Sequence, residues 1–356
     1  MKNLIGKVLF TILLVFNAAY CDNLMLAHQS YFPTTASNME IIGNEVYLMR
    51  SDGLDIYNLL SKNITNNFPS YGEEFNTITT DGHYIYMLIN NDQIVVIDAL
   101  NKPAYSLMYE YDYYPPLSSF TENGVTPNLY DIKYVSNKLL LYLAYPYHSK
   151  IVALDATDPL RIHYTPKYHK DFFGNIVNNG DNYCYYIKNN GGIADVGVYS
   201  LSSQTDVGNY HVGGNADYAY ITRLAENSKY LFVGFGFRDY TNNIFANAFD
   251  IVDKSDPSNP VWKKYIQQPL TVIAATDKYL FGEKGGALSI WDISSYKNPK
   301  EVYTIKNYNF GAIYKIIPKG DKLYVLSSRG FDIFKVYEYN PNLLNQFHTI
   351  NTKPLF

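Results

Sequence analysis

Acidic residues recur at one position of a repeated segment, and this column is the arrangement in the chain that could carry chemistry. Each member closes an aliphatic run. The members are Asn58, Asp98, Asp155, Ser200, Asp253, Asp292 and Lys335. Carboxylates at matched positions could surround a metal ion. An Asp or Asn before a turn also accepts a hydrogen bond from the backbone two residues on. We expect this second role, because the chain contains no Asp-x-Asp-x-Asp-Gly calcium loop.

Histidines and catalytic motifs give no local site. Among the seven histidines, only His163 and His169 are close in sequence, and six residues is not a ligand spacing in a helix or a strand. The chain contains neither His-Glu-x-x-His nor Gly-x-Ser-x-Gly, and Gly234-Phe235-Gly236 lies in a strand pattern without a following helix to bind a phosphate. We therefore expect no metal, no cofactor and no enzyme. The alternative is a hydrolase or oxidoreductase whose residues converge on a central channel.

The elements that must position any site are short strands in a repeated unit. Each unit has an apolar strand, a polar turn, a second strand, a loop and a third strand that ends in the column above. The first turns of the units are Gly43-Asn44, Asp81-Gly82, Ser136-Asn137, Asp181-Asn182, Asn227-Ser228, Thr276-Asp277 and Gly320-Asp321. A turn with proline, such as Asp256-Pro257, then leads to a fourth strand. Four strands in about 40 to 45 residues are the size of a β-propeller blade.

The predicted fold is all-β, a seven-bladed β-propeller of four-stranded antiparallel blades over residues 38–350. Helical periodicity appears nowhere for a useful length, which excludes βαβ architectures. Residues 22–37 are an N-terminal extension, and residues 351–356 are a C-terminal tail. We expect the seventh blade in residues 313–350, with residues 24–28 as a supplement that closes the ring and removes exposed strand edges.

The N-terminus has the pattern of an export signal. Two lysines precede a short apolar run over residues 8–16, and small residues follow it. The run is too short to span a bilayer, so residues 1–21 are predicted to be a signal peptide of a protein exported to the periplasm, the cell surface or the medium. Two fates of Cys21 stay open, a lipid anchor or simple cleavage after Ala19 or Cys21. Tyr20 stands where a lipoprotein signal has Gly or Ala.

The strand-ending repeats carry a resemblance to a known family. Ile94-Val95-Val96-Ile97-Asp98 and Ile151-Val152-Ala153-Leu154-Asp155 are aliphatic strands that end in Asp, and Pro turns follow such strands. The pattern resembles the LVIVD-repeat family of exported bacterial and archaeal proteins over about residues 38 to 350. Four of the seven copies keep the final Asp. The resemblance implies a β-propeller with a binding role at the cell surface or outside the cell, and no shared catalytic residue.

Long insertions with aromatic residues gather at one end of the predicted blades. In an antiparallel meander, alternate connections open on the same end, and residues 111–128, 144–149 and 236–247 all belong to that end. The candidate contact residues in them are Tyr111, Tyr113, Tyr114, Phe120, Tyr145, Tyr147, Phe237, Arg238 and Tyr240. Tyrosine offers a large contact area at a modest loss of conformational entropy. The aromatics of residues 111–120 are expected to lie outside the blade core, because that segment is acidic and interrupted by proline.

Together these patterns predict a non-enzymatic exported propeller that binds a protein or a surface glycan at the cell envelope through its aromatic end. A structural envelope component without a soluble ligand is a further alternative. A net charge of -4 without a basic stripe gives no footprint for nucleic acid, and no later segment reaches the length of a transmembrane span. We expect a monomer in which Cys184 is a buried, free and unreactive thiol.

Overall fold

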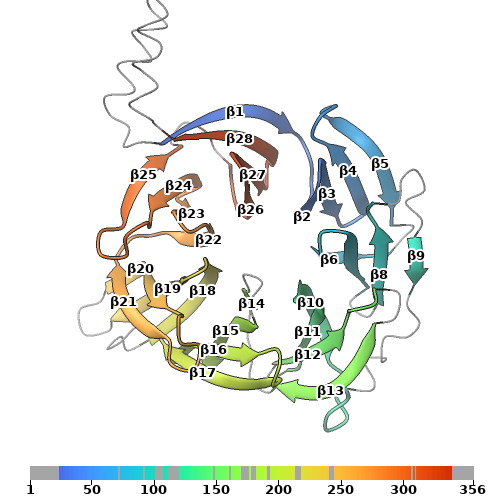
Figure 1. Ribbon diagram of the computed structural model, residues 1–356, viewed down its shortest axis with the longest axis horizontal. Coiled ribbons are helices and arrows are strands. Elements are labelled where there is room, and N and C mark those ends of the chain that lie inside the picture. The colour runs from blue at the N-terminus through green and yellow to red at the C-terminus, as the bar shows by residue number, and fades with distance from the viewer. Residues whose placement is uncertain are drawn as a thin grey trace, which may run out of the picture.

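Seven four-stranded sheets stand around a common axis (Figure 1). The computed structural model describes residues 24–70, 73–90, 93–100, 107–110, 120–146, 149–159, 162–169, 176–177, 182–190, 193–212, 218–239, 244–305, 308 and 310–338. Neighbouring strands pair antiparallel in every sheet. The prediction of a seven-bladed β-propeller with four-stranded antiparallel blades is confirmed.

The first four blades follow one another along the chain, and each runs from the axis outward. Blade 1 holds β2 (Asn38–Ile42), β3 (Glu45–Arg50), β4 (Gly53–Asn58) and β5 (Asn63–Pro69). Blade 2 holds β6 (Phe75–Thr80), β7 (Tyr84–Ile89), β8 (Gln93–Asp98) and β9 (Leu107–Glu110). Blade 3 holds β10 (Asn128–Val135), β11 (Lys138–Ala144), β12 (Ser149–Asp155) and β13 (His163–His169). Blade 4 holds β14 (Ile176–Val177), β15 (Tyr183–Asn190), β16 (Ile193–Ser200) and β17 (Thr205–His211).

The last three blades complete the circle. Blade 5 holds β18 (Tyr218–Glu226), β19 (Tyr230–Asp239), β20 (Ile244–Asp253) and β21 (Val261–Ile266). Blade 6 holds β22 (Thr271–Ala275), β23 (Tyr279–Lys284), β24 (Ala287–Asp292) and β25 (Lys300–Thr304). Blade 7 holds β26 (Ile313–Lys319), β27 (Lys322–Ser327), β28 (Gly330–Glu338) and, as its outermost strand, β1 (Leu24–Phe32).

Blade 7 joins the two ends of the described chain, and Figure 1 shows blue β1 beside dark red β28. The pairing runs from Leu24 opposite Glu338 to Phe32 opposite Phe331. The expectation that residues 24–28 supplement the last blade is confirmed, and the strand continues through Phe32. Residues 24–32 therefore belong to a blade, whereas they were predicted to lie in an N-terminal extension. Residues 1–23 and 339–356, with the predicted signal and tail, lie outside the described residues.

Five of the residues that close the third strands cap the turns that follow. Oδ1 of Asp98 accepts the N–H of Leu100 at 2.9 Å. The same bond to the backbone two residues on is made by Asn58, Asp155, Asp253 and Asp292. The turn-capping role expected for this column is confirmed for these five members. In the described part of the chain, no group of three His, Cys, Asp or Glu side chains could hold a metal ion.

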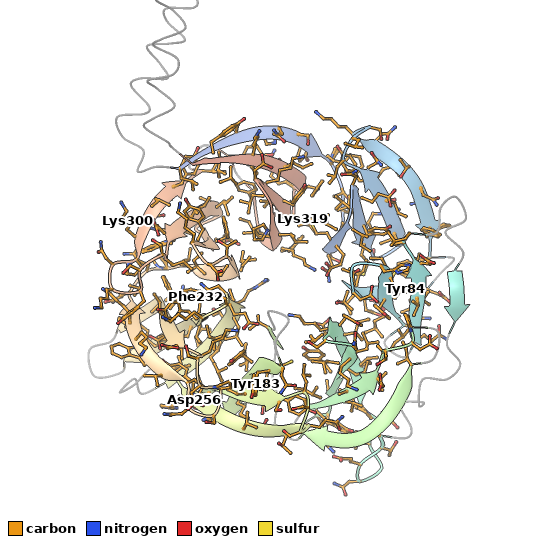
Figure 2. The ribbon with its side chains drawn as sticks, in the orientation of Figure 1. Tyr84, Tyr183, Phe232, Asp256, Lys300 and Lys319 are labelled. Atoms are coloured by element: carbon orange, nitrogen blue, oxygen red, sulfur yellow. The ribbon has the colours of Figure 1, made fainter. Side chains whose placement is uncertain are left out.

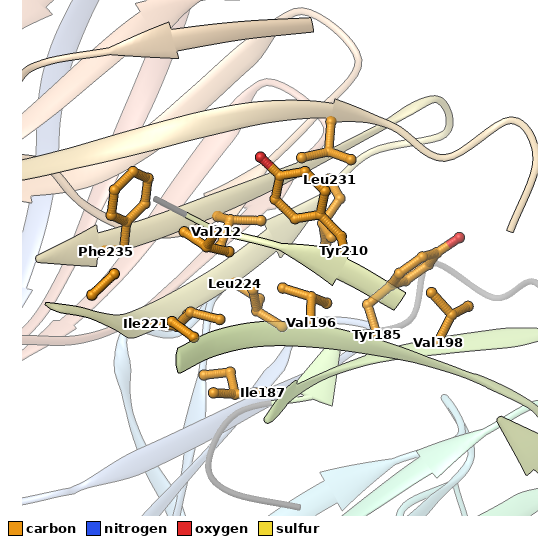
Figure 3. Packing of buried hydrophobic residues seen from close by; sticks show 14 of the residues in the cluster. Tyr185, Ile187, Val196, Val198, Tyr210, Val212, Ile221, Leu224, Leu231 and Phe235 are labelled. Atoms are coloured by element: carbon orange, nitrogen blue, oxygen red, sulfur yellow. The ribbon is translucent and has the colours of Figure 1, made fainter. Parts of the chain in front are cut away.

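The apolar core lies between neighbouring blades. Figure 3 shows one such layer, in which Tyr185 and Val196 of blade 4 pack with Leu231 and Phe235 of blade 5. A blade covered on both faces needs apolar side chains on both, which explains why the middle strands are continuous apolar runs in the sequence. Cys184 is buried in a similar layer and makes no disulfide, as expected.

Candidate functional site

The predicted contact residues fall into three groups in the structure. Tyr111, Tyr113, Tyr114, Tyr147 and Tyr240 lie outside the described residues. Arg238 is in β19, where its backbone pairs with Tyr218 and Phe245. Phe120, Tyr145 and Phe237 are described together with their side chains, and they do not form one cluster.

Phe120 and Tyr145 are core residues. Their exposed fractions are 2% and 9%, and both belong to the apolar layer between blades 2 and 3. The Tyr145 hydroxyl donates a hydrogen bond to the Phe120 carbonyl at 2.6 Å. The expectation that Phe120 lies outside the blade core is therefore wrong. Phe120 comes shortly before β10 and packs into the apolar layer between blades 2 and 3. Burying a phenylalanine there gains about 2 to 3 kcal/mol.

Phe237 leads to an exposed aromatic surface on the outside of blade 5. Its ring centroid lies 6.4 Å from that of Tyr265. Val261, Trp262 and Tyr265, all in β21, are 44%, 54% and 37% exposed. We call Phe237, Trp262 and Tyr265 the aromatic rim; Val261 stands opposite Asp253 and faces the other way. Trp262 and Tyr265 were not among the predicted contact residues, because those residues all lie in the insertions and not in the outermost strands.

A β-bulge places the two large aromatic side chains of β21 on one face. The register shifts between Ile251 and Val252 of β20, so Trp262 stands opposite Val252 and Tyr265 stands opposite Asp250. Asp250 and Val252 share a face of their strand, because side chains alternate with a period of two. The bulge thus gives Trp262 and Tyr265 the same orientation, toward blade 4.

A buried carboxylate holds the Trp262 side chain in place. Asp250 accepts hydrogen bonds from Nε1 of Trp262 at 3.3 Å and from the hydroxyl of Tyr210 at 2.6 Å. Tyr210 belongs to β17 of blade 4, so this carboxylate joins two blades. Burial raises the pKa of Asp250 to about 6, although the two donors oppose the shift. The indole is fixed through its nitrogen while its ring remains half exposed.

A second group of polar residues lies on the innermost strands. In each of six blades, one residue of the innermost strand pairs with the equivalent position of the second strand. These six residues therefore lie at the same height along the axis of the ring. These residues are Asn38, Thr77, Asp131, Arg223, Thr271 and Lys315, which we call the axial polar ring. The corresponding residue of blade 4 lies outside the described residues.

Repeated β-bulges precede most members of the axial polar ring. The register shifts immediately before Thr77, Asp131, Arg223 and Lys315. A bulge redirects a side chain and is common beside functional sites. The extra residue also breaks the alternation of the strand, so the polar column was not visible as a period in the sequence. Alignment of the first strands backward from their turns would have shown it.

The axial polar ring is linked from blade to blade. The ammonium group of Lys315 lies 3.0 Å from Oδ1 of Asn38 and 2.8 Å from Oε1 of Glu40. Asn38 donates to the hydroxyl of Thr77 at 3.2 Å, and the side chain of Thr77 makes a hydrogen bond with Asp131. These contacts join blades 7, 1, 2 and 3 in order around the axis.

Comparisons with known proteins identify the fold alone. No family model matches the chain, and no curated protein matches it. The chain is similar to the WD40 domain of Neurospora crassa Pan2 (10% identity, TM-score 0.60, 88% of this chain and 96% of that one). It is also similar to the β-propeller domain of Myceliophteria thermophila Cps50 (Swd1), at 11% identity and TM-score 0.58, over 87% of this chain and 99% of that one. BamB from Moraxella catarrhalis gives 10% identity and TM-score 0.51 over 89% and 98%.

None of the described residues forms a helix that is long and apolar enough to span a bilayer.

Proposed function

We propose that this chain is an exported, non-enzymatic β-propeller that binds a partner protein through the aromatic rim of blade 5 and the insertions beside it. The propeller fold supports this, since such folds commonly serve as scaffolds for protein interactions. The observation that carries the proposal is the half-exposed indole of Trp262, which a buried carboxylate holds in a fixed orientation. Tryptophan and tyrosine are enriched in the contact centres of protein interfaces.

The surroundings of Trp262 favour a protein over a glycan. Trp262 lies in β21, which is the outermost strand of its sheet. An outermost strand offers unpaired backbone groups that an extended peptide can use. A rigid aromatic side chain beside such an edge is an anchor that loses little conformational entropy on binding.

The test begins with a photoreactive amino acid at position 262 in the native host. Tyr337 provides the matched control position, since it is 44% exposed but lies in blade 7. We expect one dominant cross-linked protein from position 262 and none of it from position 337. Equal capture from both positions, or cross-links to glycan only, would contradict a protein site at the rim.

The identified pair is then measured with purified proteins. Trp262→Ala should raise the dissociation constant at least tenfold, because interface tryptophans commonly contribute more than about 1.4 kcal/mol to the binding free energy. Tyr337→Ala should leave it unchanged. An unchanged constant in Trp262→Ala would remove the rim from the binding site.

Export is part of the same proposal. A signal peptide over residues 1–21 and the resemblance to the LVIVD-repeat family support it, and cleavage after Ala19 or Cys21 would leave all of β1 intact. Mass spectrometry of the mature protein from the native host decides between a plain N-terminus and a lipid on Cys21. An uncleaved N-terminus in the mature protein would contradict export by this signal.

A further inference from the structure

One surface position recurs in all seven blades at one end of the ring. In each blade, the residue after the strand-closing residue donates its backbone N–H to the carbonyl of the residue before the second strand, at 2.8 to 3.1 Å. The donors are Leu59, Ala99, Ala156, Leu201, Lys254, Ile293 and Val336. Because this bond fixes the backbone in the same way seven times, the next residue stands at the same height in every blade. We call it the end position.

Four neighbouring blades have a hydroxyl group at the end position. Blades 3 to 6 have Thr157, Ser202, Ser255 and Ser294 there, all of them exposed. Each hydroxyl makes a hydrogen bond with the strand-closing residue of its own blade, at 2.6 to 3.2 Å. These side chains are polar and bonded to their own turn, as is usual for an exposed connection.

The other three blades have a large apolar side chain at the end position. Leu60 of blade 1, Leu100 of blade 2 and Tyr337 of blade 7 are 74%, 58% and 44% exposed. We call these three residues the apolar arc. Their blades are neighbours, since β2 contacts both β26 and β6. Figure 2 shows blade 1 between Lys319 of blade 7 and Tyr84 of blade 2.

The arrangement of the apolar arc fits a flat apolar phase. Its side chains share one height but stand on separate blades, so a protein partner would need a surface matched to their spacing. A bilayer is flat and fluid, and it accepts each side chain independently. Lysines flank the arc: Lys62 is two residues from Leu60, and the Lys335 ammonium lies 5.1 Å from the Tyr337 ring centroid. Lysine side chains extend along apolar surface to reach polar groups, and tyrosine is enriched where a bilayer meets water.

The first strand begins at the same end of the ring. Leu24 stands opposite Glu338, the residue after Tyr337. One of the two fates of Cys21 places a lipid three residues before Leu24. A single acyl chain holds a protein at a bilayer only weakly, so stable attachment needs a second contact with the membrane. The apolar arc is in the right place to supply that contact.

From this arrangement we propose that the end of blades 7, 1 and 2 lies on a lipid bilayer, with the side chains of the apolar arc inserted at the headgroup level. The choice of a membrane rests on the export that the proposed function includes. The aromatic rim is on the outside of blade 5, outside the three blades of the arc. Membrane contact and partner binding therefore use different surfaces of the ring.

Vesicle flotation tests the arc with the lipid-free protein that begins at residue 22. We expect this protein to float with vesicles of phosphatidylethanolamine and phosphatidylglycerol. The double variant Leu60→Ser with Leu100→Ser should lower the partition coefficient at least tenfold. Serine is the residue that blades 4 to 6 have at the end position, so the variant should melt like the wild type. Absence of flotation in the wild type, or equal flotation of the double variant, overturns the proposal.

Trp262→Ala is the control that separates the two surfaces. It should float like the wild type although it loses the partner of the rim, whereas the double variant should keep that partner. The two proposals therefore fail separately. A loss of flotation in Trp262→Ala equal to that of the double variant would assign vesicle binding to the rim and contradict the arc.

Hydrogen exchange of the wild-type protein with and without vesicles needs no variant. Amides of residues 59–62 should exchange more slowly with vesicles, while amides of residues 293–296, at the end position of blade 6, should exchange equally. Equal exchange of residues 59–62 in both conditions would contradict insertion of Leu60. A photoreactive residue at position 60 that captures a protein and no lipid in the native host would also overturn the proposal.

Discussion

Three buried aspartates share one position in the third strands of different blades. Asp55, Asp250 and Asp332 each stand three residues before the turn-capping column. Each accepts a hydrogen bond from the outermost strand of its own blade. The donors are Asn67 at 2.5 Å, Trp262 at 3.3 Å and His28 at 2.8 Å. An outermost strand has backbone hydrogen bonds to a neighbouring strand on one side only. These side-chain bonds therefore stabilise the strand of each blade that has the fewest backbone bonds.

Asp250 should make stability depend on pH in a defined window. Its folded pKa is about 6, raised from the usual 3.8, so the folded state favours the protonated form. Its contribution is complete below about pH 3.8 and is lost as the pH rises through 6. Asp250→Asn removes the buried charge and keeps a carbonyl acceptor, and it should stabilise the protein by roughly 1 to 3 kcal/mol at pH 7.5.

Denaturant unfolding of both proteins from pH 4 to pH 7.5 measures this effect. The stability difference between Asp250→Asn and the wild type should be small at pH 4 and grow through pH 6. Other carboxylates titrate equally in both proteins, so the difference reports Asp250. A stability difference that stays constant over this pH range would show that burial does not raise the pKa of Asp250.

Phe120 separates a structural role of its insertion from a binding role. Phe120→Ala should destabilise the fold by about 3 to 5 kcal/mol, because it empties a buried aromatic position. Replacing residues 111–119 with a Gly/Ser linker of equal length should cost little, since a connection of unchanged length keeps nearly the same closure entropy. Chemical denaturation of the two variants compares them. Equal loss of stability would place further residues of the insertion in the core.

A glycine begins the third strand in the first and last blades. Gly53 has φ +155° and Gly330 has φ +145°. A Cβ on Gly53 would lie 2.5 Å from the Phe68 carbonyl oxygen, and one on Gly330 would lie 2.6 Å from that of Phe32. Phe68 and Phe32 both belong to outermost strands. The missing side chain allows the fourth strand to approach where the third begins.

Gly330→Ala should loosen β1 and cost roughly 1 to 3 kcal/mol, from backbone strain and the clash with Phe32. Gly320→Ala is the matched control: its φ is +60°, but nothing lies within 4 Å of the added carbon. The control should cost about 1 kcal/mol. Hydrogen exchange of the β1 amides should accelerate in Gly330→Ala alone. Unchanged exchange there would mean that β1 tolerates the added methyl group.

The elements were predictable where local chemistry determines them, and the sites were not. Turn residues such as Gly43-Asn44 and strand-closing residues such as Asp98 act on their own backbone, so the sequence shows them directly. The axial polar ring depends on bulges that change the register in separate strands. The aromatic rim depends on a bulge that turns Trp262 to the side of Tyr265. Register is a property of two paired strands, and a single strand pattern does not contain it.

Closure of the ring depends on one strand, β1. Removing β1 would expose the edge of β28 and take away the buried Leu24 side chain together with the bond from His28 to Asp332. A protein that begins after Phe32 should melt at lower temperature and associate through the open edge. Light scattering during thermal unfolding measures both effects against the protein that begins at residue 22. A monomeric truncation with an unchanged melting temperature would show that closure contributes nothing.

The shared position of the first and last strands also sets an order in time. His28 and Asp332 meet in one blade although 304 residues separate them. A ribosome that adds about 5 to 20 residues per second needs on the order of 15 to 60 s to pass from one to the other. During that interval β1 has no strand to pair with, and the growing chain cannot complete its circle. The ring therefore cannot close before β28 has been synthesised.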